Sequence, residues 1–352
     1  MFEVESLVSG RVRIHARQRR GGPAQQGEIC RLPHQVLRKR GSPESSSLPD
    51  TGDLLAAVSE LINASITDST QSTYKASWTV FDNFRLSIKA PHCMLPIPTQ
   101  LIVLFIAYLY RRGHKAPTIR SHLSAISYPH NLLNLYNPVE NFLISKLCKG
   151  VSVLIPSGDV RLPITLDILK SLMNVITVSS TDFYEAQLYK AMCSFAFYGF
   201  MRCSEICYSQ HCIMLNQIGV FVNSHVSVSL TSFKHNTEGK VFTLRLNQKQ
   251  DVSCPVTNLV NYLKVRGSQP GPLFCKPAGS AISPSTFRNK LRSFFSVMGL
   301  NERNFKSHSF RIGAACHALS LGRTENEIQI LGRWASPPAL RKYLRVAGLH
   351  AL

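Results

Sequence analysis

One short β-like stretch lies among segments whose apolar residues recur with the period of an α-helix. Residues 219–230 and 241–246 are rich in valine and leucine, and the polar turn between them contains Gly239. Together they predict a hairpin or a small sheet. The segments 163–202 and 256–334 carry amphipathic helical patterns instead. The chain is therefore expected to be mostly α with a small β-sheet, in an α+β arrangement.

The chain divides into four parts by pattern. Residues 1–50 are rich in arginine and lack apolar periodicity, which predicts a disordered basic segment; an arm that contacts DNA or directs nuclear import is the alternative. Residues 51–150 hold four or five helical patterns and predict a small helical domain. Residues 151–162 contain Pro, Ser and Gly without a helical period and read as a linker. Residues 163–352 form the second domain.

The charge of the chain points to a polyanionic partner. There are 40 Lys and Arg residues against 20 Asp and Glu residues, a formal net charge of +20. Nucleic acid is the first expectation for a globular chain this basic, ahead of an anionic membrane. In the helical domain, Lys115, Arg120 and His122 are the candidates for contacts to DNA.

Secretion and membrane insertion are not expected. The most apolar run, residues 101–110, is about half of the roughly 20 residues that a spanning helix needs. The first 20 residues carry acidic residues before their basic ones and no apolar core, unlike a signal peptide. The ten cysteines follow no framework spacing and are expected to be reduced thiols.

Four patches of basic and aromatic residues are spread along the second domain. They contain Arg202 with Glu205, Lys234, His308 with Arg311, and Trp334 with Tyr343. Taken singly, each patch is explained as well by a surface ion pair, a solvated turn, a helix face or core packing. Their joint occurrence in this order is what favours a shared site.

The order Arg, Lys, His-x-x-Arg, Trp, Tyr resembles the catalytic order of the tyrosine recombinases, the family of phage integrases and chromosome-dimer resolvases. The motifs GFMR-x-SE and LGRW…Y look most similar to the branch found in eukaryotic mobile elements. The resemblance extends over residues 51–350. It implies two domains in a C-shaped clamp around duplex DNA. The implied activity is site-specific cleavage and rejoining of DNA through a covalent 3′-phosphotyrosyl intermediate, with self-association into a synaptic assembly.

The residue types suit this chemistry. Phosphoryl transfer places negative charge on non-bridging oxygens, and the planar guanidinium of arginine binds two such oxygens at once. Arg202 and Arg311 fit that role, and Trp334 offers an indole N–H. A histidine of near-neutral pKa, as expected at position 308, can take up the proton of the nucleophile, Tyr343, or donate to the phosphate.

Two further assignments concern Lys234 and Glu205. Lys234 suits a general acid for the leaving 5′ oxygen, with Lys240 as the rival lysine of the same turn. Glu205, one helical turn from Arg202, is expected to orient it. No metal ion or cofactor is expected, because cationic side chains supply the activation. Zinc binding by Cys203, Cys207, His211 and Cys212 is disfavoured because their spacing matches no familiar ligand set.

Other functions and departures from the family pattern stay open at this point. A domesticated DNA-binding protein that no longer cuts DNA is one alternative, and a type IB topoisomerase is another. Only nine residues follow Tyr343, which puts docking of a C-terminal helix on a neighbouring protomer in doubt. Pro337 and Pro338 are expected to loosen or redirect the helix that carries Tyr343. The location is expected to be the nucleus in a eukaryote and otherwise the cytoplasm.

Overall fold

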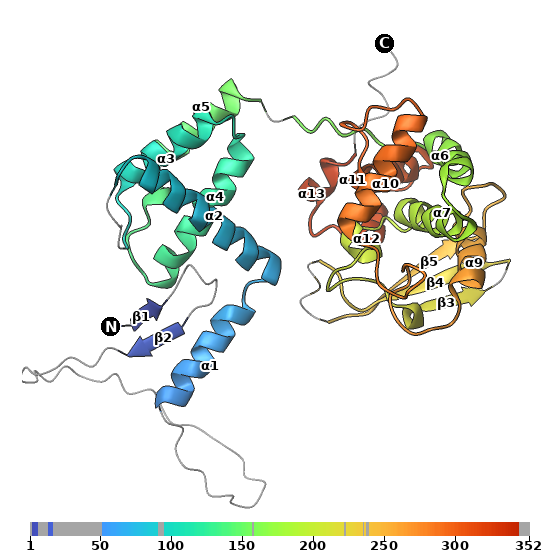
Figure 1. The fold of residues 1–352 in the computed structure, drawn as a ribbon, viewed down its shortest axis with the longest axis horizontal. Helices are drawn as coiled ribbons and strands as arrows, with labels where there is room; N and C mark the ends of the chain where they lie inside the picture. The colour runs from blue at the N-terminus through green and yellow to red at the C-terminus, as the bar shows by residue number, and fades with distance from the viewer. Residues whose placement is uncertain are drawn as a thin grey trace, which may run out of the picture. The chain divides into compact units, whose positions relative to one another are not determined.

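The computed structural model describes residues 2–5, 13–16, 51–90, 95–156, 158–221, 223–234, 236 and 239–344. The chain forms two compact units, residues 1–158 and 159–352 (Figure 1). Most described residues are helical, and the second unit contains one three-stranded antiparallel sheet. The expectation of a mostly α chain with a small sheet is confirmed.

Five helices and a pair of short strands make up the described part of the first unit. Its elements are β1 (Phe2–Glu5), β2 (Arg13–Ala16), α1 (Thr51–Ala64), α2 (Asp68–Ser87), α3 (Thr99–Arg111), α4 (Ala116–Leu132), the one-turn helix η2 (Pro138–Glu140) and α5 (Phe142–Leu154). Aromatic residues of α2 and α3 form the centre of the core, where Phe81, Phe84 and Phe105 are fully buried. The apolar residues of α1 are not part of it, since Leu54 and Leu61 are more than half exposed.

The structure describes two short strands within residues 1–50, the segment for which disorder is expected. Strands β1 and β2 pair antiparallel, with Val4 opposite Ile14 and Glu5 opposite Arg13. Both segments alternate apolar and charged residues, which is the period of a strand and escapes a search for helical periodicity. The rest of residues 1–50 lies outside the described residues.

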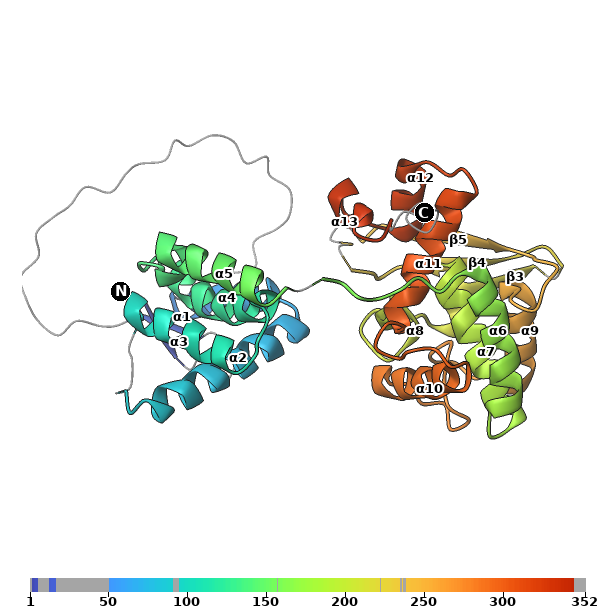
Figure 2. The same cartoon turned by 90° about the horizontal axis from the view of Figure 1, so that it is seen from above.

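The second unit contains eight helices and three strands in its described part. They are α6 (Leu166–Ser179), α7 (Phe183–Tyr198), α8 (Cys203–Ile206), β3 (Ile218–Phe221), β4 (His225–Leu230), β5 (Phe242–Asn247), α9 (Pro255–Arg266), α10 (Pro284–Val297), α11 (Ser307–Ser320), α12 (Glu325–Gly332) and α13 (Pro337–Arg341), with the 3-10 turn η3 (Leu215–Gln217) before β3. Helix α7 runs through the middle, buried on nearly all sides, between α6, α9 and α11 (Figure 2).

The sheet has the strand order β3-β4-β5 and closes one side of the core. Val226, Val228 and Leu230 alternate with half-buried residues along β4, so one face of the strand packs inward. Val228 pairs with Leu244 of β5, and helix α9 lies against both strands. This sheet supports the turn that contains Lys234.

The segment before α6 is fixed to α11 rather than free. The amide of Leu162 donates to the carbonyl of Asn304 at 2.8 Å, and the amide of Ile164 donates to the carbonyl of Ser309 at 3.1 Å. A Cβ at Gly313 would lie 1.9 Å from the carbonyl oxygen of Ile164, so only glycine permits this approach.

The boundary between the two units lies within the expected linker, residues 151–162, and both ends of that segment make contacts of their own. Helix α5 continues to Leu154 because Val151 is buried in the core of the first unit. At the other end, Leu162 is bonded to the chain just before α11. Pro, Ser and Gly between these points are the residues that gave the linker pattern.

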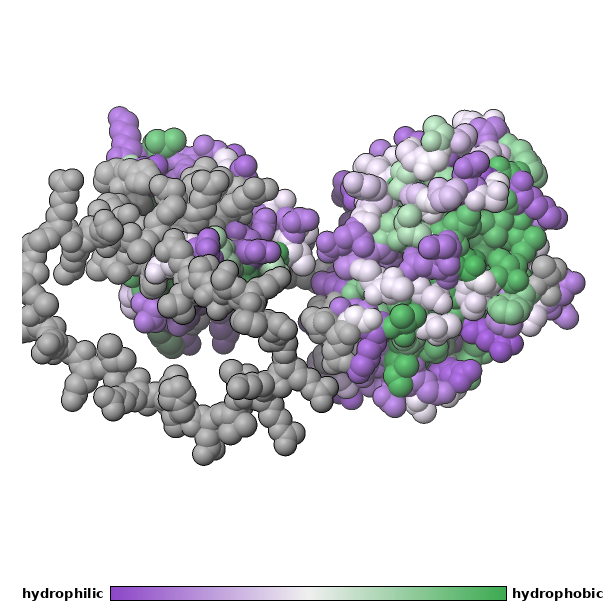
Figure 3. Space-filling model, turned by 90° about the horizontal axis from the view of Figure 1, so that it is seen from below, coloured by the Kyte–Doolittle hydropathy of each residue, from purple (hydrophilic) through white to green (hydrophobic). Residues whose placement is uncertain are grey.

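The surface of the second unit mixes polar and apolar residues (Figure 3). Its exposed large apolar residues include Phe183, Phe221, Val241 and Val297, while its largest aromatic residues are buried. No described helix is both long and apolar enough to cross a membrane.

Candidate functional site

A buried carboxylate connects two arginines that are far apart in the sequence. Glu205 is fully buried, and its Oε1 accepts from Arg202 at 3.1 Å while its Oε2 accepts from Arg333 at 2.8 Å. The Arg202 guanidinium also donates to the backbone carbonyl of Arg333 at 2.8 Å. Burial alone would raise the pKa of Glu205, but the two arginines and the Arg202 amide lower it. The carboxylate is thus charged and holds Arg202 in place.

Arg311 is almost completely buried on helix α11, with 1% of its surface exposed. It donates to the carbonyls of Phe200 and Gly332, and its guanidinium carbon lies 3.9 Å from the centre of the Trp334 ring. Burial lowers the pKa of Arg311 to about 9, with Arg202 adding to the effect, so it stays protonated at neutral pH. Arg311 thus places a fixed positive charge beside the rings of Trp334 and Tyr343.

The chain reverses direction at the end of α12, and this places Trp334. Arg333 has a φ of 56°, in the left-handed region. A Cβ at Gly332 would lie 1.6 Å from the Trp334 ring, so glycine is required for the indole to fold back there. The indole nitrogen of Trp334 is buried, and none of the described residues accepts a hydrogen bond from it.

Tyr343 follows helix α13, and hydrophobic contacts hold α13 against α11. Leu340 is fully buried with Trp334 and Ala315, and Tyr343 packs on this cluster. Pro337 and Pro338 occupy the first turn of α13, where proline is tolerated, so they begin the helix rather than loosening it as expected. Residues 345–352, to which the question of C-terminal docking belongs, lie outside the described residues.

His308 meets Tyr343 directly. His308 Nε2 lies 2.6 Å from the Tyr343 hydroxyl, across 35 residues of sequence. Burial lowers the pKa of His308 to about 4, and the charges of Arg161 and Arg311 contribute. This corrects the expected near-neutral pKa. A neutral imidazole at pH 7 can accept the tyrosine proton, with the tautomer set by that contact.

The low pKa of His308 predicts a pH-dependent stability. A histidine in the unfolded chain binds a proton below about pH 6.5, whereas His308 in the folded chain does so only near pH 4. Unfolding therefore takes up a proton between these values, and stability falls as the pH falls through that window. We expect the melting temperature, measured by calorimetry at pH 7 and at pH 5, to fall less for His308→Asn than for the wild type. Equal losses in His308→Asn and wild type would contradict the low pKa.

Lys234 and Lys240 both lie exposed in the turn between β4 and β5. Phe233, next to Lys234, lies 5.9 Å from the guanidinium carbon of Arg333, and Phe242 lies 5.4 Å from it. The base of the turn is therefore anchored beside Arg333. The ranking of the two lysines as general acid stays a prediction.

The three candidate DNA contacts of the first unit differ in character. Lys115 is the N-cap residue of α4 and Arg120 lies one turn later, and both are exposed. His122 is half-buried, with its ring 6.1 Å from that of Phe105. Burial and nearby His114 lower the pKa of His122, so it carries little positive charge at neutral pH. The exposed cations are thus Lys115 and Arg120.

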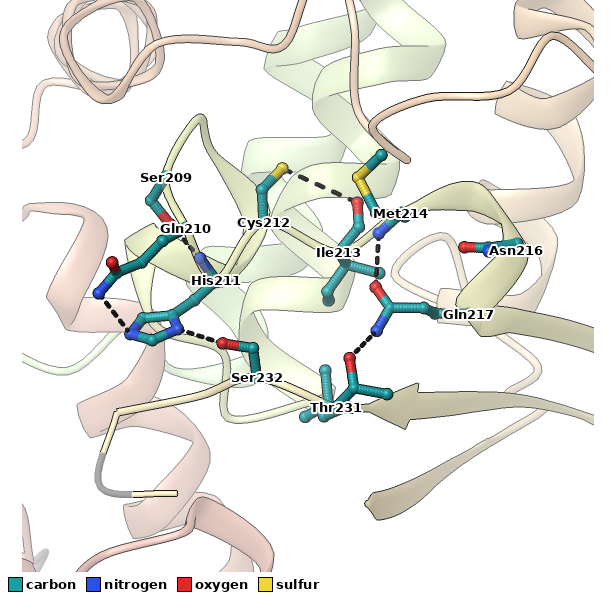
Figure 4. A pocket seen from close by; sticks show the side chains of 11 residues that line it. Ser209, Gln210, His211, Cys212, Ile213, Met214, Asn216, Gln217, Thr231 and Ser232 are labelled. Atoms are coloured by element: carbon teal, nitrogen blue, oxygen red, sulfur yellow. Dashed lines mark hydrogen bonds between the residues drawn. The ribbon is translucent and has the colours of Figure 1, made fainter. Parts of the chain in front are cut away.

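The cysteine and histidine group considered for zinc does not converge. His211 Nδ1 contacts the Ser232 hydroxyl at 2.7 Å, and Cys212 Sγ contacts a backbone carbonyl at 3.8 Å. Both line a hollow of about 410 Å³, where polar side chains bond to one another (Figure 4). Within the described ranges, no three His, Cys, Asp or Glu residues come together as metal ligands.

Two arginines were missed by sequence reasoning. Arg333 was read only as part of the LGRW motif, although it is buried and paired with Glu205. Arg161 was placed in the linker, yet its charge acts on both His308 and Tyr343. The sequence signal for Arg333 is a charged residue within an apolar turn. The sequence gives no signal for Arg161, because its position depends on contacts between its segment and α11.

Comparison with solved structures identifies a shared fold. The XerH site-specific recombinase bound to palindromic difH substrate has a TM-score of 0.59 and 13% identity, covering 83% of this chain and 80% of that one. A lambda integrase dimer bound to a COC′ core site has a TM-score of 0.59 and 15% identity, covering 84% and 95%. The Tn1549 transposon integrase in complex with transposon right end DNA has a TM-score of 0.60 and 13% identity, covering 83% and 94%.

No family model matches the chain, and no curated protein matches it. At 13–15% identity the likeness establishes the fold: this chain is built like the site-specific recombinases and integrases.

Proposed function

We propose that this chain is a site-specific DNA recombinase that cleaves and rejoins DNA through a covalent 3′-phosphotyrosyl bond to Tyr343. The observation that carries the proposal is the meeting of Tyr343, His308, Arg311 and Trp334 from three separate segments. A hydroxyl beside a neutral base and a buried cation is the arrangement needed for nucleophilic attack on phosphate. The fold shared with DNA-bound integrases supports the same conclusion.

The parts of the site take distinct roles in this proposal. His308 accepts the proton of the Tyr343 hydroxyl as oxygen attacks phosphorus. Arg202 and Arg311 bind the non-bridging oxygens, and the buried N–H of Trp334 gains a phosphate oxygen as acceptor. Glu205 and Arg333 position Arg202 without touching substrate. The phosphotyrosyl ester conserves the energy of the broken bond, so rejoining needs no further source.

The wider assignments follow from the same resemblance and stay proposals. The two units form a C-shaped clamp on duplex DNA, with Lys115 and Arg120 binding backbone phosphates. Copies of the chain associate on paired sites into a synaptic assembly. The chain derives from a mobile element, most similar to the eukaryotic branch, and acts in the nucleus if its host is a eukaryote and otherwise in the cytoplasm. Phosphate contacts dominate affinity, so binding weakens steeply with salt.

The proposed function is tested by trapping the covalent intermediate. The probe is a duplex that carries the repeats flanking the gene, with a nick beside the cleavage position so that the short fragment diffuses away. We expect a protein–DNA adduct whose linked peptide contains Tyr343 and whose DNA end is a 3′ phosphate. DNA binding without any adduct would favour the silent DNA-binding protein. Relaxation of a supercoiled plasmid that lacks these repeats would favour a topoisomerase.

The role of Lys234 is separable from that of the arginines. Cleavage expels a 5′ alkoxide, which needs a proton, whereas a 5′ thiolate leaves without one. We expect Lys234→Ala to slow single-turnover cleavage of a normal substrate by about 100-fold or more. On a substrate with sulfur at the 5′-bridging position, Lys234→Ala should regain most of the wild-type rate.

Two variants act as controls for this rescue. Arg311→Ala should stay slow on the sulfur substrate, because its defect is in stabilising charge on the non-bridging oxygens. Lys240→Ala should behave like wild type on both substrates. Rescue seen only in Lys240→Ala would move the general acid to Lys240, and equal rescue of lysine and arginine variants would remove the general-acid role.

A further inference from the structure

Two cysteines lie at the two ends of helix α8, next to Arg202. Cys203 Sγ and Cys207 Sγ are 3.7 Å apart. Cys203 is partly exposed, whereas Cys207 is fully buried. A disulfide needs an S–S distance of about 2.05 Å, so a small movement of this one-turn helix brings the sulfurs to bonding distance.

The surroundings of Cys203 stabilise its thiolate. The hydrogen bond to Cys207 lowers the pKa of Cys203 to about 7 in spite of burial, and the Ser307 hydroxyl and the charge of Arg288 add to the effect. The same contact and burial raise the pKa of Cys207, which therefore keeps its proton. One reactive and one protonated thiol in contact is the arrangement of a redox-active pair.

A hollow lies beside two residues that interact with Cys203. Arg288 and Ser307, which both interact with Cys203, line a hollow of about 420 Å³ between α10 and α11. Arg303 and Lys306 line the same hollow. The charge of Arg288 favours the thiolate form of Cys203.

We propose that Cys203 is a peroxide-reactive thiol and that Cys207 is its resolving partner, so that oxidation joins the two in an intramolecular disulfide. The Cys203 thiolate attacks one oxygen of hydrogen peroxide, the O–O bond breaks, and hydroxide leaves to give a sulfenic acid. Cys207 sulfur then attacks Cys203 sulfur, and the sulfenic hydroxyl leaves as water with the Cys207 proton. The two sulfurs lose two electrons, and the two peroxide oxygens gain them.

The disulfide would act on the site through Glu205. This residue lies between the two cysteines and holds both Arg202 and Arg333. Drawing the sulfurs together moves the turn that aims the carboxylate. We expect oxidation to lower DNA cleavage at least tenfold and dithiothreitol to restore it; this consequence rests on the proposed function, whereas the disulfide itself does not.

The disulfide is detected in the full-length chain without any DNA. After treatment with hydrogen peroxide and alkylation, trypsin and a protease that cleaves after glutamate release residues 203–205 and 206–234. These peptides stay together only through a disulfide. Because 206–234 also contains Cys212, the matched variants are Cys212→Ser, which should keep the linkage, and Cys207→Ala, which should lose it.

A second measurement covers the case in which Cys207→Ala fails to fold. In the wild type, the alkylation rate of Cys203 should reach half its maximum near pH 7, whereas Cys212, whose pKa burial raises, should react only at higher pH. Absence of linked peptides in oxidised wild type, or their loss in Cys212→Ser, would overturn the proposal. Linked peptides in a chain that forms no DNA adduct would support the thiol pair and reject the proposed function separately.

Discussion

Tyr343→Phe is expected to abolish the covalent protein–DNA adduct while DNA binding stays within about twofold of wild type. The change removes only the hydroxyl that contacts His308 at 2.6 Å, and the ring keeps its packing against Trp334 and α11. No other hydroxyl replaces it, so cleavage should fall below detection. The measurement is adduct yield on the nicked substrate by denaturing gel, with binding followed by mobility shift at fixed salt.

Tyr184→Phe is the matched control. Tyr184 is a half-buried tyrosine of the same unit whose hydroxyl donates to the carbonyl of Cys275, away from the site. It should form the adduct at the wild-type yield. If Tyr343→Phe formed as much adduct as wild type, Tyr343 would not be the nucleophile and the proposed mechanism would fail.

Arg311→Ala is expected to lower single-turnover cleavage by about 10³-fold or more at saturating protein, with a much smaller loss of DNA affinity. The charge it faces grows only as the transition state forms, so its removal acts on the rate more than on binding. Because Arg311 is buried and bonded to two carbonyls, Arg311→Lys is measured beside it. Lysine keeps the positive charge but lacks the planar guanidinium that binds two phosphate oxygens. Cleavage by Arg311→Lys should therefore stay at least about 100-fold slower than cleavage by the wild type.

Arg120→Ala provides the opposite pattern. Arg120 is an exposed residue of the first unit, so its loss should weaken binding and reduce the salt dependence of affinity with little effect on cleavage at saturation. The division between rate and affinity would be wrong if Arg120→Ala slowed saturated cleavage as much as Arg311→Ala.

The helical pattern and the small sheet were predictable because their periodicities are local. The amphipathic period of α6 and the alternation of β4 are both written in consecutive residues. The meeting of His308 with Tyr343 was inferred only through the order of motifs, since contact across 35 residues has no local signature.

Other features depended on packing that the sequence does not display. The pairing of Glu205 with Arg333 follows from the reversal at α12, where Arg333 adopts positive φ without being glycine. The low pKa of His308 follows from burial and from Arg161, whose position depends on a chain crossing. Proline at the start of α13 was read as a disruption, because its tolerance there depends on where the helix begins.

The segment of chain bonded to α11 sets where the second unit can be divided from the first. The backbone amides of Leu162 and Ile164 donate to carbonyls on either side of His308 in the sequence. These bonds also place Arg161 where its charge acts on His308. A fragment that begins at α6 would lose these bonds, expose the groove beside Gly313 and leave His308 with a weaker positive field. A fragment that begins at Asp159 keeps Arg161 and both hydrogen bonds. The second unit as a portable fragment is therefore longer than its helices suggest, and gene fusions that exchange the first unit would have to join ahead of this segment.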